Sequence, residues 1–244
     1  MPRPHAPFAL CLVTWLAVGC DATIEPITVA PGCPDRPLRE PPEFDDEPGD
    51  RLVSNFENGA KELAQVNGRD GSWILGSDLS GGSWTAEVSK KCVAHGEYSG
   101  HFAGSGYTSW GINWTAVFRK AVYDSTVAYS YAAVPYDGRA YQGISFFAAL
   151  GGENGPDHPI PMGITTMDNA YNGKICKGAC MDYYRIDVPL IRSWKRYKLL
   201  FADMAQGNFG VPHVPTMRKD QLVGFIIFPD QQFDIWIDDV RLEP

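Results

Sequence analysis

From Arg51 to the C-terminus, short apolar or alternating runs recur along the chain, separated by clusters of Gly, Asn, Asp and Pro. This alternation is typical of strands joined by turns. Helical periodicity is weak, with at most short helical turns over residues 58–66 and 201–206. The pattern predicts an all-β fold over residues 50–244, a β-sandwich or jelly roll of two antiparallel sheets. We expect strands at residues 52–56, 99–104, 110–118, 126–134, 143–150, 183–188, 194–201, 223–228 and 233–242.

The last predicted strand has the clearest alternation. Successive side chains of a strand point to opposite sides, so one face of this strand is apolar and the other carries two acids. Burying two acids in a terminal strand costs free energy unless they are solvated, paired or bound to a cation. The first face has Phe233, Ile235 and Ile237, and the second has Asp234, Trp236 and Asp238.

Another carboxylate, Glu57, lies at the start of the domain, just before Asn58-Gly59. First and last strands are often neighbours in sandwiches, so Glu57 and Asp238 could meet. We expect them to hold a structural Ca²⁺ together with backbone carbonyls, since calcium takes about six to eight oxygens. The alternatives are a solvated strand edge or an ion pair with Arg51 or Arg241.

The N-terminus has an apolar run at residues 8–18, between a basic start and Gly19-Cys20. It is too short for a spanning helix, which needs about 20 apolar residues, and it fits a signal peptide over residues 1–20. Its end resembles the lipobox of bacterial lipoproteins, which implies lipidation of Cys20 and an exported, membrane-anchored lipoprotein of the cell envelope. The alternatives are an ordinary signal peptide cut near Gly19 or an uncleaved anchor.

Residues 21–49 contain seven prolines and eight acidic residues. Such a segment cannot bury enough apolar surface to fold, so we expect a disordered tether. The net charge of −8 gives no electrostatic footprint for nucleic acid. It also disfavours adhesion of the domain to anionic lipid, so the lipid anchor is the expected membrane contact. We expect a monomer.

The sequence has six cysteines. Cys11 would be removed with the signal peptide and Cys20 would be lipidated. The remaining four, in an oxidising compartment, predict two disulfides. Cys176 and Cys180 suit a local bridge, which leaves Cys33 to pair with Cys92. A metal cluster is the alternative, but the usual Cys-x-x-Cys or His spacing is missing.

Four motifs occur in a characteristic order: Phe56-Glu57-Asn58-Gly59, Gly143-Ile144-Ser145-Phe146-Phe147-Ala148, Ser193-Trp194-Lys195-Arg196-Tyr197 and Trp236-Ile237-Asp238-Asp239-Val240. With Gly104-Ser105-Gly106-Tyr107-Thr108-Ser109-Trp110-Gly111, they resemble the galactose-binding-like jelly-roll carbohydrate-binding modules, as found in secreted bacterial lipoproteins. The resemblance covers residues 51–244. It implies glycan binding and a structural calcium, with Glu57 and Asp238 as ligands. Asn58 and Phe147 depart from the family pattern, in which an acid and a Trp are commoner.

Sugar-binding faces need flat rings that stack on pyranose C–H faces, and polar groups for the hydroxyls. Aromatic residues also fill sandwich interiors, so we expect many of the rings, including Trp194 and Phe146, in the core. The candidates for ligand contact are Tyr107, Trp110, Trp114, Asp182 and Tyr184.

Recognisable catalytic groups are missing from the sequence. A glycosidase needs two carboxylates across a cleft, and a nucleophile elbow needs Gly-x-Ser-x-Gly before a helix. We therefore expect a non-catalytic domain that binds a polysaccharide or oligosaccharide. One alternative is a jelly-roll polysaccharide lyase or glycosidase, and another is a structural or protein-interaction lipoprotein of the cell envelope.

Overall fold

The computed structural model describes residues 32–34, 49–127, 130–152, 159–176, 178–210, 213–229 and 232–244. The expected signal peptide over residues 1–20, the lipidated Cys20 and most of the expected tether lie outside the described residues. Within the described ranges, no helix is long and apolar enough to cross a membrane.

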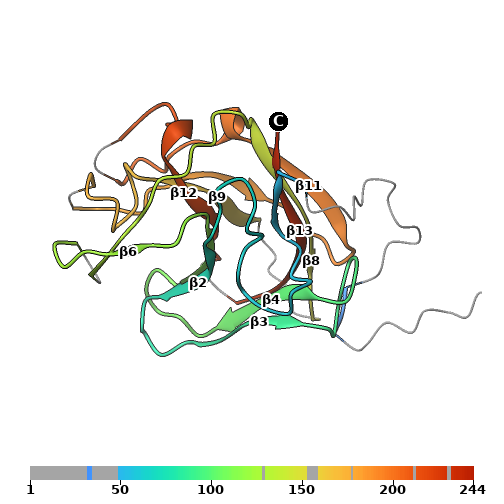
Figure 1. Ribbon diagram of the computed structural model, residues 1–244. Helices are drawn as coiled ribbons and strands as arrows, with labels where there is room; N and C mark the ends of the chain where they lie inside the picture. The colour runs from blue at the N-terminus through green and yellow to red at the C-terminus, as the bar shows by residue number, and fades with distance from the viewer. Residues whose placement is uncertain are drawn as a thin grey trace, which may run out of the picture.

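Two antiparallel sheets pack face to face as a β-sandwich, which confirms the predicted fold class (Figure 1). The six-stranded sheet has the order β11 (Lys195–Leu200), β8 (Gly143–Leu150), β13 (Phe233–Glu243), β4 (Ser99–Ser105) and β3 (Ser83–Ser89), with β1 (Leu52–Ser54) also paired to β13. The five-stranded sheet has the order β10 (Tyr184–Val188), β9 (Ile160–Thr166), β12 (Leu222–Ile227), β5 (Ile112–Val117) and β2 (Ser72–Ser77). Within the described part of the chain, 3₁₀ turns occur at Phe201–Asp203 and Lys219–Gln221.

Strand β13 has the predicted alternation. Its residues Phe233, Ile235 and Ile237 lie in the core between the sheets, whereas Trp236 packs on the outer face. A register shift follows Asp238, where Asp239 has a φ of 45°. This β-bulge reverses the alternation, so Val240 and Leu242 return to the core. The first strand pairs with the last, as predicted from the usual arrangement of sandwiches.

The core between the sheets is rich in aromatic rings. Trp114 is fully buried there and contacts Phe56, Trp73 and Phe102, with ring centroids 6.1, 4.5 and 5.6 Å apart respectively. Phe146 is fully buried in the same core, as predicted.

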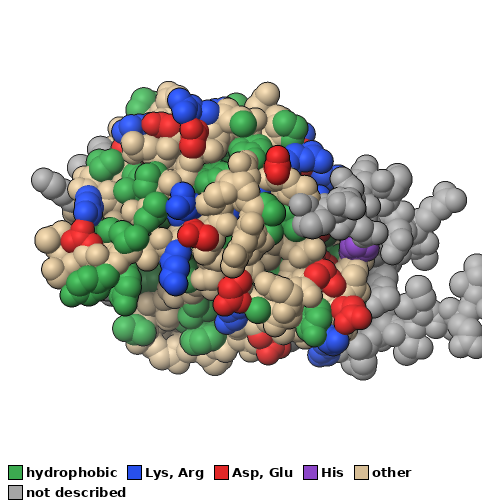
Figure 2. All heavy atoms as spheres, in the orientation of Figure 1, with side chains coloured by type: hydrophobic (Ala, Val, Ile, Leu, Met, Phe, Trp, Pro, Cys, Tyr) green, Lys and Arg blue, Asp and Glu red, His purple; other side chains and the backbone are tan. Residues whose placement is uncertain are grey.

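A two-stranded hairpin of β6 (Val122–Tyr123) and β7 (Tyr131–Ala132) projects from the body of the sandwich (Figure 1). Val122, Tyr123 and Tyr131 are all exposed on it. Figure 2 shows hydrophobic side chains gathered on this side of the molecule. The strand predicted at residues 126–134 is therefore much shorter, because few of its residues reach a sheet that could pair with them.

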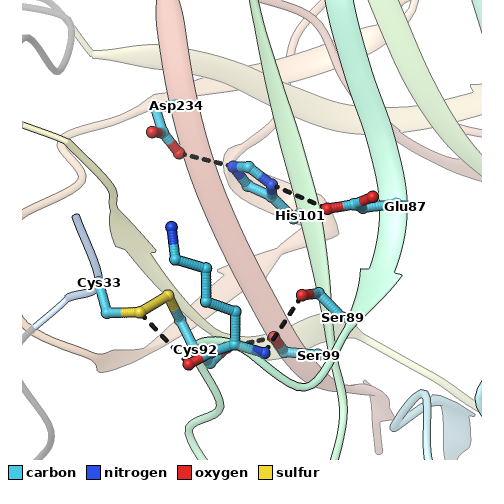
Figure 3. The surroundings of a disulfide bond; sticks show 8 residues. Cys33, Glu87, Ser89, Cys92, Ser99, His101 and Asp234 are labelled. Carbon is cyan, nitrogen blue, oxygen red and sulfur yellow. Dashed lines mark hydrogen bonds and ion pairs between the residues drawn. A yellow bond between two sulfur atoms is a disulfide. The ribbon is translucent and has the colours of Figure 1, made fainter. Parts of the chain in front are cut away.

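Both predicted disulfides, Cys33–Cys92 and Cys176–Cys180, are present. The first fixes residues 32–34 over the outer face of the six-stranded sheet (Figure 3). A second apolar cluster lies there, formed by Cys92, Phe147, Ala149, Trp194 and Trp236. Trp194 is therefore buried as predicted, but outside the sandwich rather than between its sheets.

Candidate functional site

The outer face of the five-stranded sheet carries a continuous group of aromatic rings. In the middle of this face, Ile226 pairs with Thr115 on one side and Gly163 on the other, and Gly163 pairs with Arg185. These residues point away from the core, because their chain neighbours Ala116, Phe225 and Ile164 lie in it. Because Gly163 has no side chain, the outer face of the sheet is open above β9, between Ile226 and Arg185.

Rings from the strands on either side of β9 meet across it. Tyr183, directly before β10, and Phe228, directly after β12, have ring centroids 5.7 Å apart. Since β9 lies between β10 and β12, these rings reach over the strand that contains Gly163. A larger residue there is excluded in any case, because a Cβ would lie 1.9 Å from the carbonyl oxygen of Tyr184.

The row extends from both of these rings. Trp110 stacks on Phe228 with centroids 5.8 Å apart and an interplanar angle of 15°. On the other side, the guanidinium carbon of Arg185 lies 5.8 Å from the centre of the Tyr183 ring and 6.0 Å from that of Phe209. We call this set, Trp110, Phe228, Tyr183, Arg185 and Phe209, the aromatic strip.

The two ends of the aromatic strip face solvent and its middle is buried. Trp110 and Phe209 are 45% and 52% exposed, whereas Tyr183 is 1% exposed. Burial raises the pKa of Tyr183, and the charge of Arg185 offsets this only in part. The strip therefore has exposed rings at both ends, with the buried, neutral ring of Tyr183 and the charged Arg185 between them.

Trp110 is positioned by a hydrogen-bonded loop. The carboxylate of Asp78 accepts from the backbone N–H groups of Ser109 and Gly111 at 3.2 and 2.8 Å. The hydroxyl of Ser80 accepts from the N–H of Thr108 at 2.9 Å. Desolvation acts to raise the pKa of Asp78, but the hydrogen bonds from Ser80, Gly111 and Ser109 lower it overall. An ionised Asp78 thus fixes the turn on either side of Trp110.

Of the five ligand-binding residues predicted from the sequence, Trp110 lies in the aromatic strip. Tyr107 is half-buried in the same loop, where its hydroxyl donates to the carbonyl of Ser83 at 3.3 Å. Its ring lies against Gly82, since a Cβ on that glycine would be 2.5 Å from it. Tyr107 therefore supports the loop beside Trp110.

The other three candidates are buried. Trp114 is fully buried in the core, and Tyr184 is 1% exposed with its hydroxyl donating to the carbonyl of Val214 at 2.6 Å. Asp182, also 1% exposed, accepts from the N–H groups of Gly207, Phe209 and Gly210 at 2.6, 3.2 and 3.0 Å. Rings and carboxylates without exposed surface have no contact to offer a glycan. Asp182 instead holds the loop that carries Phe209.

Four residues of the aromatic strip were not predicted from the sequence: Tyr183, Arg185, Phe209 and Phe228. The alternation in β10 contained a usable signal, because Tyr184, Ile186 and Val188 form the apolar face and leave Tyr183 and Arg185 on the other. Phe228 had no such signal, since the residues of β12 before it are buried on both faces. Phe209 lies in a loop far along the chain from its neighbours.

Glu57 and Asp238, predicted to meet, both accept hydrogen bonds from the loop between β3 and β4. Glu57 accepts from the N–H groups of Glu97 and Tyr98 at about 3.0 Å. Asp238 accepts from the N–H groups of Ala94 and His95 at 3.3 and 3.2 Å. Burial raises the pKa of Asp238 well above its usual range, and the charges of Asp239 and Glu57 add to this. Arg241, one alternative partner, pairs with Asp239 at 2.8 Å.

This donor set does not fit calcium. Calcium needs about six to eight oxygens around it, but the loop turns backbone N–H groups toward both carboxylates. Gly96 has a φ of +69° and packs so closely that a Cβ would lie 2.4 Å from Glu57 Oε1. Among the described residues there is also no group of three His, Cys, Asp or Glu that could hold a metal ion. The amides of the loop take the place that a cation would have.

Neither a protein-family model nor a curated protein matches the sequence. Among solved structures, the chain is similar to the family 11 carbohydrate-binding module of the cellulosomal cellulase Lic26A-Cel5E of Clostridium thermocellum. The TM-score is 0.53 at 15% identity, over 80% of this chain and 94% of that chain. A family 11 module from Clostridium thermocellum in complex with a β-1,3-1,4-mixed-linked tetrasaccharide gives 0.50 at 14% identity, over 79% and 94%. The protein thus has the β-sandwich fold of carbohydrate-binding modules.

Proposed function

We propose that this protein is a non-catalytic carbohydrate-binding domain that holds a polysaccharide on the aromatic strip. The observation that carries the proposal is the exposed indole of Trp110, stacked on Phe228 and supported by a sheet. A ring fixed on one side presents its other side at little cost in side-chain entropy. The fold of the carbohydrate-binding modules supports the same function.

The chemistry of the strip suits a neutral glycan. Trp110 and Phe209 offer apolar faces for the C–H faces of sugar rings. Arg185, half-buried between two rings, supplies a fixed set of hydrogen-bond donors for hydroxyls. These two features together favour a chain of several sugar units, because Trp110 and Phe209 lie at opposite ends of the strip.

The catalytic alternative has less support. Glycoside hydrolysis uses two carboxyl groups about 5–10 Å apart. The aromatic strip contains one cation and four rings, with no carboxylate among its five members. We therefore retain binding, rather than cleavage, as the function of this face.

We further propose that the domain is exported and anchored through a lipid on Cys20. The apolar run at residues 8–18 before Gly19-Cys20 supports this proposal. Expression of the full chain in a bacterium fed a radiolabelled fatty acid tests it. The wild-type chain should be labelled and partition into detergent, and Cys20→Ala should do neither. A labelled Cys20→Ala chain would exclude this anchor.

Affinity electrophoresis of the full chain against a panel of soluble polysaccharides, including a mixed-linkage β-glucan, tests the binding proposal. At least one polysaccharide should retard the wild-type chain, and Trp110→Ala should remove most of the retardation. Tyr123→Ala is the matched control, because it removes an exposed ring from the β6–β7 hairpin, one that is even more exposed than Trp110 (72% against 45%). If no polysaccharide retards the chain, or if Trp110→Ala behaves like Tyr123→Ala, the strip is not a glycan site.

A further inference from the structure

The six-stranded sheet has a hollow on its outer face, away from the aromatic strip. Thr85, Ala103 and Asp234 are register partners on the adjacent strands β3, β4 and β13, and all three line it. The hollow is also lined by Ser83 and Ser105, which are the next register pair of β3 and β4 on the same face of the sheet. The cavity has a volume of about 340 Å³, at the lower end of the roughly 300–1,000 Å³ of small-molecule sites.

The hollow exists because a row of small side chains lies beside a row of large ones. Two positions further along the strands, Glu87, His101 and Trp236 are register partners on the same face. The imidazole of His101 stacks on the indole of Trp236, with centroids 3.9 Å apart and planes 7° from parallel. This stack lies in the row next to Thr85 and Ala103 on the same face of the sheet.

The same histidine holds the carboxylate at the edge of the hollow. Figure 3 shows His101 between Asp234 and Glu87. A hydrogen bond of 3.0 Å joins its Nε2 to Asp234 Oδ1, and its Nδ1 lies 3.6 Å from Glu87 Oε1. Asp234 keeps 31% of its side chain exposed, so it is fixed in direction and still open to a ligand.

We propose that this hollow is a second binding site, which takes a single neutral sugar unit. Hydroxyls of Ser83, Thr85 and Ser105 can donate or accept, and the carboxylate of Asp234 accepts, which matches the mixed donor and acceptor character of sugar hydroxyls. The carboxylates of Asp234 and Glu87 repel acidic sugars and phosphates. Trp84, which also lines the hollow, is 51% exposed and offers an aromatic ring to the sugar.

The proposal goes beyond the aromatic strip and does not depend on it. The strip and the hollow lie on the outer faces of different sheets, which pack against each other through their inner faces. A protein with both sites can therefore bind two glycan segments at once. In that arrangement, the strip binds along a chain and the hollow receives a chain end or a branch.

Nuclear magnetic resonance of the ¹⁵N-labelled full chain tests the hollow directly. The probes are glucose, galactose, mannose and N-acetylglucosamine, each titrated into the millimolar range. We expect at least one of them to shift the backbone amides of Thr85, Ala103 and Asp234 in a saturable way. Ala103→Leu should weaken this response at least tenfold by filling the floor, and Ala121→Leu, the same change next to β6, should leave it unaltered.

Two results would overturn the second site. Either none of the four sugars shifts these amides, or the shifts survive Ala103→Leu in a chain whose melting temperature matches the wild type. The indole N–H signal of Trp110 reports on the strip in the same spectra. Because the strip is proposed to bind a chain of several sugar units, its own probe is an oligosaccharide of a mixed-linkage β-glucan. An oligosaccharide that leaves the Trp110 signal unchanged would contradict the strip alone, and monosaccharides that leave the amides of the hollow unchanged would contradict the second site alone.

Discussion

The indole of Trp110 lies on the ring of Phe228, with only 15° between the two planes. Trp110 is in the loop before β5 and Phe228 directly follows β12, so neighbouring strands deliver the two halves of this stack. Phe228 stacks on one face of the Trp110 indole and also contacts the ring of Tyr183. The stack thus links the exposed ring to the buried part of the strip.

Phe228→Leu should weaken polysaccharide binding by roughly tenfold, about 1.4 kcal/mol, although Phe228 itself is only partly exposed. Leucine keeps an apolar side chain but gives Trp110 no flat surface, so the indole loses its fixed direction. The free energy of unfolding should fall by less than about 1.5 kcal/mol, since the change is apolar to apolar. Calorimetric titration with a polysaccharide that retards the wild-type chain measures the affinity, and urea unfolding measures the free energy of unfolding. Unaltered affinity would show that Trp110 needs no support.

The fold was largely predictable because its strongest signals are local. Strand β8 was predicted with its exact ends, since its apolar run begins at Gly143 and is followed by Gly151-Gly152. Strands β2, β3 and β9 were missed. The first two begin and end with Ser and lie next to Gly- and Ser-rich turns, and β9 contains Pro161 and Gly163, so propensity argued against strands that tertiary pairing stabilises.

The candidate site was less predictable, because exposure depends on which way a ring points. Trp110 and Trp114 are four residues apart in one aromatic stretch, yet the first is 45% exposed and the second is fully buried. Gly111, with a φ of +94°, turns the chain between them. The partners of Trp110 come from distant segments, and nothing in the sequence links Phe228 or Phe209 to it.

Calcium should have no effect on stability. Glu57 and Asp238 already accept backbone N–H groups from Ala94 to Tyr98, and these amides would repel a cation. The melting temperature should therefore be the same in calcium and in a chelator, whereas a ligand at 100 times its Kd would add about 2.7 kcal/mol. Differential scanning calorimetry measures this. A melting temperature that falls by several degrees on chelation would restore the calcium site expected from the family resemblance.

Glu243, at the end of β13, should contribute to stability in a pH-dependent way. Burial acts to raise its pKa, but the hydroxyl of Ser145 and the charges of Lys198 and Arg196 lower the pKa overall. A depressed folded-state pKa gives stability that is present above the unfolded value, about 4.3, and is lost as the pH falls through the folded value.

Glu243→Gln should therefore cost roughly 1 kcal/mol near neutral pH, a modest loss because Arg196 and Lys198 are partly exposed and screened. The difference from the wild type should shrink as the pH falls below about 4. Urea unfolding of both chains across this range measures it. A difference that is constant with pH would mean that the charge of Glu243 is unimportant and that only its shape matters.

The two disulfides should differ in their contribution to stability, because they close loops of very different length. Cys33 and Cys92 are 59 residues apart in sequence, and Cys176 and Cys180 only 4. If a disulfide acts by restricting the unfolded chain, the first contributes about 4 kcal/mol and the second about 2 kcal/mol. Cys33→Ala should thus lower the free energy of unfolding about twice as much as Cys176→Ala, in urea unfolding without reductant.

Cys92 also packs with Trp194 and Trp236, so Cys33→Ala is the cleaner change, since it leaves this apolar cluster its buried sulfur. Loss of the bridge frees residues 32–34 from the outer face of the six-stranded sheet, near His101 and its partner Asp234 (Figure 3). If the proposed hollow depends on that cover, its response to sugars should weaken in Cys33→Ala, and the response at Trp110 should not. If Cys33→Ala and Cys176→Ala lower the free energy of unfolding equally, the unfolded chain gains little freedom when the long loop between Cys33 and Cys92 opens.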